Sequence, residues 1–216
     1  MVGKSNRLAA PVWPRLAAMS AIAAVALWRF PLFHLRPLAA LAEAGAGGAG
    51  VAAAADRFWD EQLPTARATD VAIVLAALQK DPKAAIQTYA RTVGLGAAYF
   101  FVSGEGRVIA RERNSVRLAV GAGADAPEVE LQTGPVFGNT VRDGTGLLDV
   151  NRFSSLQDFN ALAGELNERI ESRVLPILRD RAQPGTRVGF SGCAEAVEPT
   201  PGQPLLVIVP TRVEIR

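Results

Sequence analysis

The strongest strand signal in the chain is the segment AAYFFVSGEGRVIARER, residues 97–113. Its first half, Tyr99–Val102, is aromatic and β-branched, which favours an extended strand. Ser103-Gly-Glu-Gly106 has the composition of a tight turn, and Arg107–Arg113 then resumes a strand-like pattern. The segment therefore predicts a β-hairpin that begins a sheet.

The sheet is expected to continue on the C-terminal side of this hairpin. Ser115–Val120 and Glu128–Thr133 alternate as strands do, and Gly121–Ala126 between them predicts a hairpin connection. Val136–Val141 is a weaker strand candidate. Two further strands are predicted near the end of the sequence, at Arg187–Ala196 and Leu205–Ile215.

A long helix is predicted between these two groups of strands, at about 154–182. Two overlapping capping boxes open it, because Ser154 is followed by Gln157 and Ser155 by Asp158. Pro176 predicts a kink or a restart within it. The apolar positions recur at helical spacing and are Leu156, Phe159, Leu162, Leu166 and Ile170.

The region before residue 97 is predicted to be helical. Thr69 is a candidate N-cap for a helix over Asp70–Lys80, and Asp81-Pro82 is a cap followed by proline that opens a helix over Lys83–Val93. The predicted order is helices, then strands, one helix and more strands. This order predicts an α+β fold whose antiparallel sheet can close into a small barrel.

The N-terminal segment predicts membrane attachment. The apolar run Leu16–Trp28 follows Lys4, Arg7 and Arg15, which places the N-terminus in the cytoplasm. Residues 1–37 fit an uncleaved signal-anchor, a signal peptide cleaved after a small residue within 39–46, or an apolar core helix of a cytosolic protein. Residues 38–55 are predicted to be an Ala/Gly linker, so the G-x-G-x-x-G match inside it does not indicate a dinucleotide site.

Counting residues excludes several chemistries. Residues 1–50 hold five basic side chains against one acidic, whereas the rest holds 18 basic and 20 acidic, so no nucleic-acid partner is expected. One cysteine, Cys193, and one histidine, His34, exclude an intramolecular disulfide, a cysteine-rich metal site and a histidine-based triad. We therefore expect no metal and no cofactor, and we interpret Cys193 as a small core residue.

The candidate binding residues are Asn139, Thr140, Arg142 and Asp143, which lie in the Gly-rich stretch Gly134–Asp143. Arg142 can offer a bidentate fork to an anion at the edge of the barrel, or it can pair with Asp143 and lock the loop onto the barrel. No two carboxylates form a recognisable acid/base pair, so we expect no enzyme activity. The charged series from Glu165 to Arg181 is interpreted as a solvated helix face.

The order of motifs resembles the bacterial family of predicted periplasmic lipoproteins, domain-of-unknown-function family 2291. The matching motifs are Phe30-Pro-Leu-Phe33, Phe58-Trp59, Leu75-Ala-Ala-Leu78, Asp81-Pro82, Tyr99–Gly106, Gly134-Pro135, Gly138-Asn139-Thr140, Arg142-Asp143 and Leu166-Asn167. Two features depart from the family pattern. The lipid-bearing cysteine is absent, and Ser155-Leu156-Gln157 stands where an Asn-Gln pair is expected.

The resemblance implies a helical subdomain at 56–96 and an OB-like β-barrel at 97–216, anchored in the inner membrane with the bulk of the chain in the periplasm. It also implies a non-catalytic accessory or binding module of a sugar-type ABC import system, with transporter or solute-binding protein components as partners. The alternative is a purely structural interaction domain that docks on a membrane or a solute-binding partner.

Overall fold

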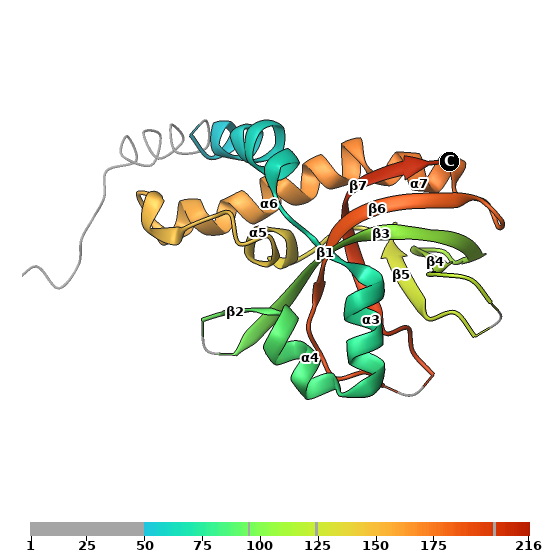
Figure 1. Ribbon diagram of the computed structural model, residues 1–216. Coiled ribbons are helices and arrows are strands. Elements are labelled where there is room, and N and C mark those ends of the chain that lie inside the picture. Colours follow the sequence, from blue (N-terminus) through green and yellow to red (C-terminus); the bar gives the residue numbers. More distant parts are fainter. Residues whose placement is uncertain (1–49, 95, 124, 201) are drawn as a thin grey trace, which may run out of the picture. The chain divides into compact units, whose positions relative to one another are not determined.

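The computed structural model describes residues 50–94, 96–123, 125–200 and 202–216 (Figure 1). The predicted membrane segment at 1–37 and residues 38–49 of the predicted linker at 38–55 lie outside these residues. The rest of the predicted linker, 50–55, is helical, so the linker prediction is wrong there. Within the described ranges, no helix has both the length and the apolar character that a membrane span requires.

Five strands close a barrel of the OB type. They are β3 (Ala97–Arg111), β4 (Ser115–Ala119), β5 (Glu128–Gln132), β6 (Arg187–Glu195) and β7 (Leu206–Ile215). Their order around the barrel is β3-β4-β5-β7-β6, and β6 pairs back onto β3. All these pairs are antiparallel except β5 with β7. The expectation of a purely antiparallel sheet is therefore wrong, because a closed ring with an odd number of strands must contain a parallel pair.

The predicted turn at Ser103-Gly-Glu-Gly106 is also wrong. Strand β3 runs straight through it, and β3 pairs with β6 without interruption from Tyr99 to Arg107. A Cβ atom at Gly104 would collide with Cγ1 of Val71, and one at Gly106 would lie 2.9 Å from Cβ of Leu118. These glycines therefore allow neighbouring elements to approach the strand closely. Glycine within a strand often has this role, besides its role in turns.

Two short helices precede β3 and pack beside it (Figure 1). Helix α3 (Val71–Lys80) is capped by Asp70, whose Oδ1 accepts a hydrogen bond from the backbone N of Ala72 at 2.7 Å. Thr69, the predicted cap, instead belongs to the two-residue strand β1 (Thr69–Asp70), which pairs with β3 in parallel. The cap lies one residue later than predicted, because Asp70 also pairs with β3, at Ser103, and the helix begins at the residue after it.

Helix α4 (Pro82–Tyr89) begins as predicted. The Asp81 carboxylate accepts a hydrogen bond from the backbone N of Ala84 at 3.0 Å, and Pro82 occupies the first turn. The helix ends four residues earlier than predicted, because Arg91–Val93 forms strand β2 and pairs with the start of β3.

The connection from β5 to β6 carries the helices that lie above the barrel in Figure 1. Helix α5 (Thr140–Gly144) replaces the predicted strand at Val136–Val141, since Gly138 adopts a φ of +80° and ends the extended run. The short helix η3 (Val150–Arg152), α6 (Leu156–Arg173) and α7 (Leu175–Arg181) follow. Ser155 caps α6 and Pro176 lies in the first turn of α7, as the sequence predicts.

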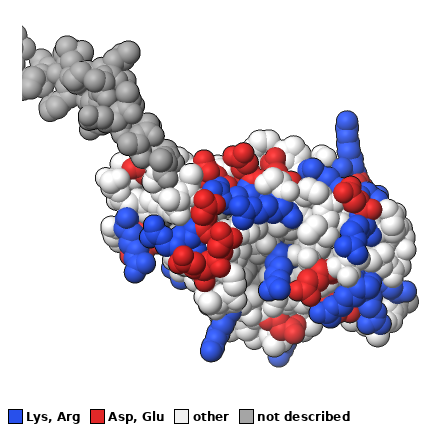
Figure 2. Space-filling view, turned by 90° about the horizontal axis from the view of Figure 1, so that it is seen from above, with Lys and Arg blue, Asp and Glu red and all other residues white. Residues whose placement is uncertain are grey.

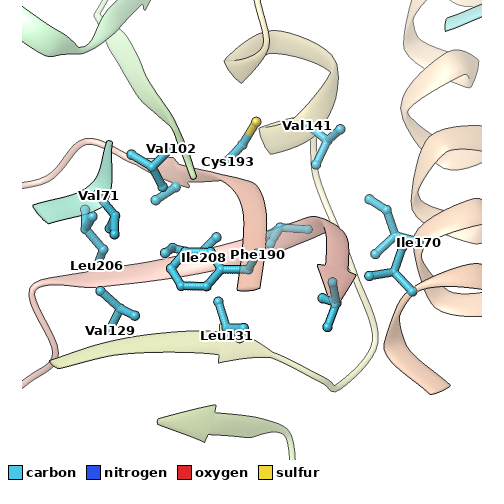
Figure 3. Close-up of a cluster of buried hydrophobic side chains, with 14 of the residues drawn as sticks. Val71, Val102, Val129, Leu131, Val141, Ile170, Phe190, Cys193, Leu206 and Ile208 are labelled. Atoms are coloured by element: carbon cyan, nitrogen blue, oxygen red, sulfur yellow. The ribbon is translucent and has the colours of Figure 1, made fainter. Parts of the chain in front are cut away.

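The N-terminal end of the described chain is helical over 50–57 and continues into η1 (Phe58–Gln62) and η2 (Leu63–Thr65). Its buried side chains, such as Phe58, belong to the same hydrophobic cluster as the barrel residues. Figure 3 shows Val141 of α5 and Ile170 of α6 beside the barrel cluster around Phe190 and Ile208. Helices and barrel therefore share one core, and Cys193 is fully buried in it, as predicted.

Candidate functional site

The four predicted binding residues differ in their exposure to solvent. Asn139 flanks the N-terminus of the helix and is exposed, with its carbonyl accepting a hydrogen bond from the backbone N of Asp143 at 2.9 Å. Thr140 begins the helix and is partly exposed. The side chains of Arg142 and Asp143 are only 7% and 9% exposed. The structure therefore brings Arg142 and Asp143 together but not with the side chains of the other two.

Arg142 links α5 to α6. Its Nε and Nη2 donate to the two carboxylate oxygens of Asp143, at 2.8 and 3.0 Å. Its Nη1 donates to Oδ1 of Asn160 at 2.9 Å and to the carbonyl of Phe159 at 3.4 Å. The guanidinium also lies 4.2 Å from the ring centroid of Phe159. These contacts correspond to the second of the two expectations, in which Arg142 locks the loop onto the barrel.

A shallow depression of about 470 Å³ lies beside this ion pair, between β2 and the loop that follows α5. Arg91 and Arg142 line it together with Asp143 and the loop residues 146–150. Tyr99 lies near the same carboxylate, and its pKa is raised first by burial and then by the negative charge of Asp143. Asp143 pairs with Arg142, so among the described residues Arg91 supplies the positive charge in this depression that meets no carboxylate.

A second depression is better suited to hold a ligand. It has a volume of about 380 Å³ and lies between helix 50–57 and the loop 147–158, so we call it the loop groove. Its apolar walls come from Val51, Leu147, Leu148 and Phe153. Its polar lining residues are Arg57, Gln62, Asp149, Arg152, Ser154 and Asp158.

The two carboxylates of the loop groove are bound to their own loop. Asp149 accepts hydrogen bonds from the backbone N and the side-chain amide of Asn151, at 2.9 and 2.8 Å. Asp158 accepts one from the Ser154 hydroxyl at 2.8 Å. This bond, together with the bond from Ser155, lowers the pKa of Asp158 below its ordinary value. Both carboxylates are thus held in the loop itself, away from the arginines.

Three polar groups of the loop groove have no partner among the described residues. The guanidinium groups of Arg57 and Arg152 form no hydrogen bond or ion pair with any residue in the described ranges. The Oε1 atom of Gln62 is buried and accepts no hydrogen bond there. A buried acceptor without a donor is uncommon in a folded protein, where most buried polar atoms are paired. This acceptor, beside two exposed arginines, identifies the loop groove as the candidate functional site.

No pattern in the sequence indicates the loop groove. Its lining residues come from two segments about ninety positions apart, and the loop at 145–153 has neither helical nor strand periodicity. No local motif joins Arg57 and Gln62 to Arg152. Only the tertiary packing of helix 50–57 against the loop before α6 brings them to one surface.

The predicted solvated face of the long helix is exposed at Glu168, Arg173, Asp180 and Arg181, but other residues of the series make tertiary contacts. Arg169 donates to Asp56 at 2.8 Å, to the carbonyl of Ala52 at 3.2 Å and to Glu165 at 2.8 Å, and its side chain is 11% exposed. Burial by itself lowers the pKa of Arg169, but the bonds to Glu165 and Asp56 raise it overall. Figure 2 shows acidic and basic groups side by side on this face.

Two residues of the same series bind the backbone of the barrel connection. Glu171 accepts a hydrogen bond from the backbone N of Val136 at 2.7 Å, and Arg179 Nε donates to the carbonyl of Thr133 at 2.8 Å. The prediction missed these contacts because helical spacing shows which residues share a face but not what that face meets.

Comparison with known proteins supports the fold and the family. A crystal structure of an OB-fold protein from Thermotoga maritima MSB8 matches with a TM-score of 0.67 and 22% identity, over 77% of this chain and 98% of that one. A search of curated proteins found no match. The profile of a family described as predicted periplasmic lipoprotein (DUF2291) matches residues 22–214, nearly the whole chain. The protein therefore belongs to this family of predicted periplasmic lipoproteins.

Proposed function

We propose that this protein is a non-catalytic binding module on the periplasmic side of the inner membrane, where it serves a sugar-type ABC import system as an accessory. The N-terminal apolar segment is the proposed anchor. The only cysteine in the sequence, Cys193, is buried in β6, where a lipid chain has no room.

The observation that carries the binding role is the set of unpartnered polar groups in the loop groove. Two exposed arginines and a buried acceptor border apolar walls, and small-molecule sites usually combine such walls with a few placed polar groups. The groove volume of about 380 Å³ lies within the range of small-molecule sites.

The state of the carboxylates supports binding rather than catalysis. Asp143 is paired with Arg142, Glu165 with Arg169 and Glu105 with Arg187 and Arg216. A general acid or base needs a carboxyl group that can exchange its proton with a substrate. These carboxyl groups are instead bound by arginines of the same chain.

The charges on the strand face that OB folds commonly use for oligonucleotides argue against a nucleic-acid partner. On β4 and β5 it carries Glu128 and Glu130 around Arg117, which is paired with Glu112 and Glu128. Single-strand binding uses basic grooves with stacking aromatic rings, and this mostly acidic surface differs from them.

Affinity capture of the full chain from intact membranes tests the accessory role. We expect ABC transporter subunits or a solute-binding protein, identified by mass spectrometry, to co-purify with the tagged protein. The same capture with an unrelated tagged protein of the same membrane is the control. Recovery of neither component with the wild-type chain would rule out the transport role.

Phe137 favours a second candidate, a structural domain that docks on another protein. Its side chain is 80% exposed, although the loop is held on both sides. Glu171 binds the backbone N of Val136, and Asn167 Nδ2 donates to the carbonyl of Gly138 at 3.1 Å. A rigidly presented aromatic ring is typical of the anchor residues of interfaces. If docking is the function, Phe137→Ser abolishes partner capture and leaves ligand binding in the loop groove unchanged.

A further inference from the structure

We propose that the loop groove binds a small organic anion that also carries hydroxyl groups, such as a sugar acid or a sugar phosphate. This inference rests on the proposed binding role and names the class of ligand. Three features of the groove support it: the cations, the buried acceptor and the apolar walls.

The two arginines supply the attraction for an anion. Arg57 and Arg152 are both exposed, and within the described residues neither guanidinium meets a carboxylate. Asp149 and Asp158 line the same groove, but their hydrogen bonds run to Asn151 and Ser154. A planar guanidinium with free donors fits a carboxylate or a phosphate bidentately.

Gln62 supplies the attraction for a hydroxyl group. Its Oε1 is shielded from solvent, and no donor within the described chain reaches it. The amide is in the wall of the groove, between the helical N-terminal segment and the loop. Because this oxygen is shielded from solvent, a ligand O–H group can donate to it only after the side chain turns towards the groove. A ligand with acceptors alone cannot satisfy it.

The apolar walls suit the carbon skeleton of a small, ring-shaped ligand. Phe153 is fixed by an edge contact with Phe159, at a centroid distance of 5.2 Å and an interplanar angle of 61°. Leu147, Leu148 and Val51 complete the apolar lining. A volume of about 380 Å³ lies at the lower end of ligand sites and matches a single sugar ring rather than a long chain.

The same chemistry occurs in the headgroup of an anionic glycerophospholipid. The loop beside the groove exposes Val150 and Leu156, which are 41% and 66% accessible. Exposed apolar side chains near arginines are also found on surfaces that lie against a bilayer. The experiment must therefore separate a free solute from a lipid headgroup.

Calorimetric titration of the full chain in uncharged detergent tests the proposal. The probes are glucuronate, glucose 6-phosphate and glucose, which share a ring and differ in charge. We expect an anion to bind at least about tenfold more tightly than glucose, because charge-assisted hydrogen bonds are stronger than neutral ones. The double variant Arg57→Gln/Arg152→Gln should lose this difference, whereas Arg181→Gln, an exposed arginine on α7 that does not line the groove, should keep it.

Vesicle binding separates the two sources. Binding to phosphatidylglycerol vesicles that exceeds binding to phosphatidylcholine vesicles, and that the double variant loses, assigns the site to a headgroup of the proposed chemistry. Equal affinity for glucose and glucuronate would overturn the proposal. So would an unchanged double variant, or the absence of binding to every probe. If transporter subunits still co-purify in those cases, the ligand class fails and the accessory role stands.

Discussion

At the residue scale, Arg142 shows how a folded protein compensates a buried charged side chain. Asp143 neutralises its charge. Asn160 Oδ1 and the carbonyl of Phe159 accept hydrogen bonds from its Nη1, and the Phe159 ring packs against the guanidinium. Removing one member of a buried pair leaves the other charge uncompensated, which costs more than the pair itself contributes.

Arg142→Ala is therefore expected to lower the free energy of unfolding by about 3–5 kcal/mol. Urea unfolding of the full chain in detergent measures it. The matched control is Arg212→Ala, whose partner is Glu214 and whose side chain is 68% exposed. Exposed pairs contribute less than about 1 kcal/mol, so the control should unfold almost as the wild type does. A loss below 1 kcal/mol for Arg142→Ala would show that Arg142 is not a structural lock.

Cys193 is expected to make stability fall at high pH. Burial raises the pKa of its thiol above the ordinary value of 9.0, so above that pH the unfolded chain loses a proton that the folded chain keeps. Fewer protons are then bound in the unfolded state, and the free energy of unfolding falls by up to about 1.4 kcal/mol per pH unit. Urea unfolding between pH 8 and pH 10.5 measures the slope. Cys193→Ala should lack this contribution, and identical slopes in the two proteins would contradict it.

Part of the chemistry around α5 could be predicted from adjacent residues. The pairing of Arg142 with Asp143 was one of two expectations, because neighbours in sequence can meet in any fold. Arg142 also contacts Phe159 and Asn160, which lie 17 and 18 positions further along the chain. These contacts depend on how α5 packs against α6. No local pattern carries that information.

At the element scale, the glycines of β3 determine how closely its neighbours approach. We expect Gly104→Ala to lower the free energy of unfolding by about 1–3 kcal/mol, because its methyl group collides with Val71 of α3. The collision is with a side chain, so adding Val71→Ala should recover part of the loss. Gly192→Ala is the comparison, since its methyl group would lie 2.5 Å from the backbone oxygen of Val209 and no side-chain truncation relieves that. If Val71→Ala restored the stability of Gly104→Ala and of Gly192→Ala equally, a collision with the Val71 side chain would not be the cause.

The helix at 50–57 is tied to α6 by Arg169, which holds Asp56 and the carbonyl of Ala52. Arg169→Ala should raise amide hydrogen exchange within 50–57 about tenfold, since a hydrogen bond to a charged group contributes about 1.5 kcal/mol. Hydrogen exchange followed by mass spectrometry measures this. Arg181→Ala is the control, and unchanged exchange in Arg169→Ala would show that apolar packing alone holds the helix.

Most elements could be predicted from periodicity and caps, whereas their partners could not. Ser155, Asp81 and Pro176 mark helix starts through local chemistry, and the structure confirms all three. The turn at Ser103–Gly106 was wrong because glycine serves both turns and close packing, and composition cannot separate these roles. The cap predicted at Thr69 was wrong by one residue, because threonine and aspartate can both cap a helix and composition alone does not choose between them.

At the scale of the whole molecule, the closed barrel leaves no free edge among its five strands, and the helices extend its core on one side. The two features to which we assign binding, the loop groove and Phe137, lie outside the barrel strands. In this account the barrel supports the connection between β5 and β6. The proposed binding role belongs to that connection and to the N-terminal helix that faces it.

Native mass spectrometry of the full chain, released from its own membranes in detergent, tests the central claim most directly. The binding role predicts a bound small anion on the wild-type protein, a loss of that mass in Arg57→Gln/Arg152→Gln, and its retention in Arg181→Gln. A wild-type spectrum without any added small molecule, or one in which the double variant retains the same mass, would contradict it.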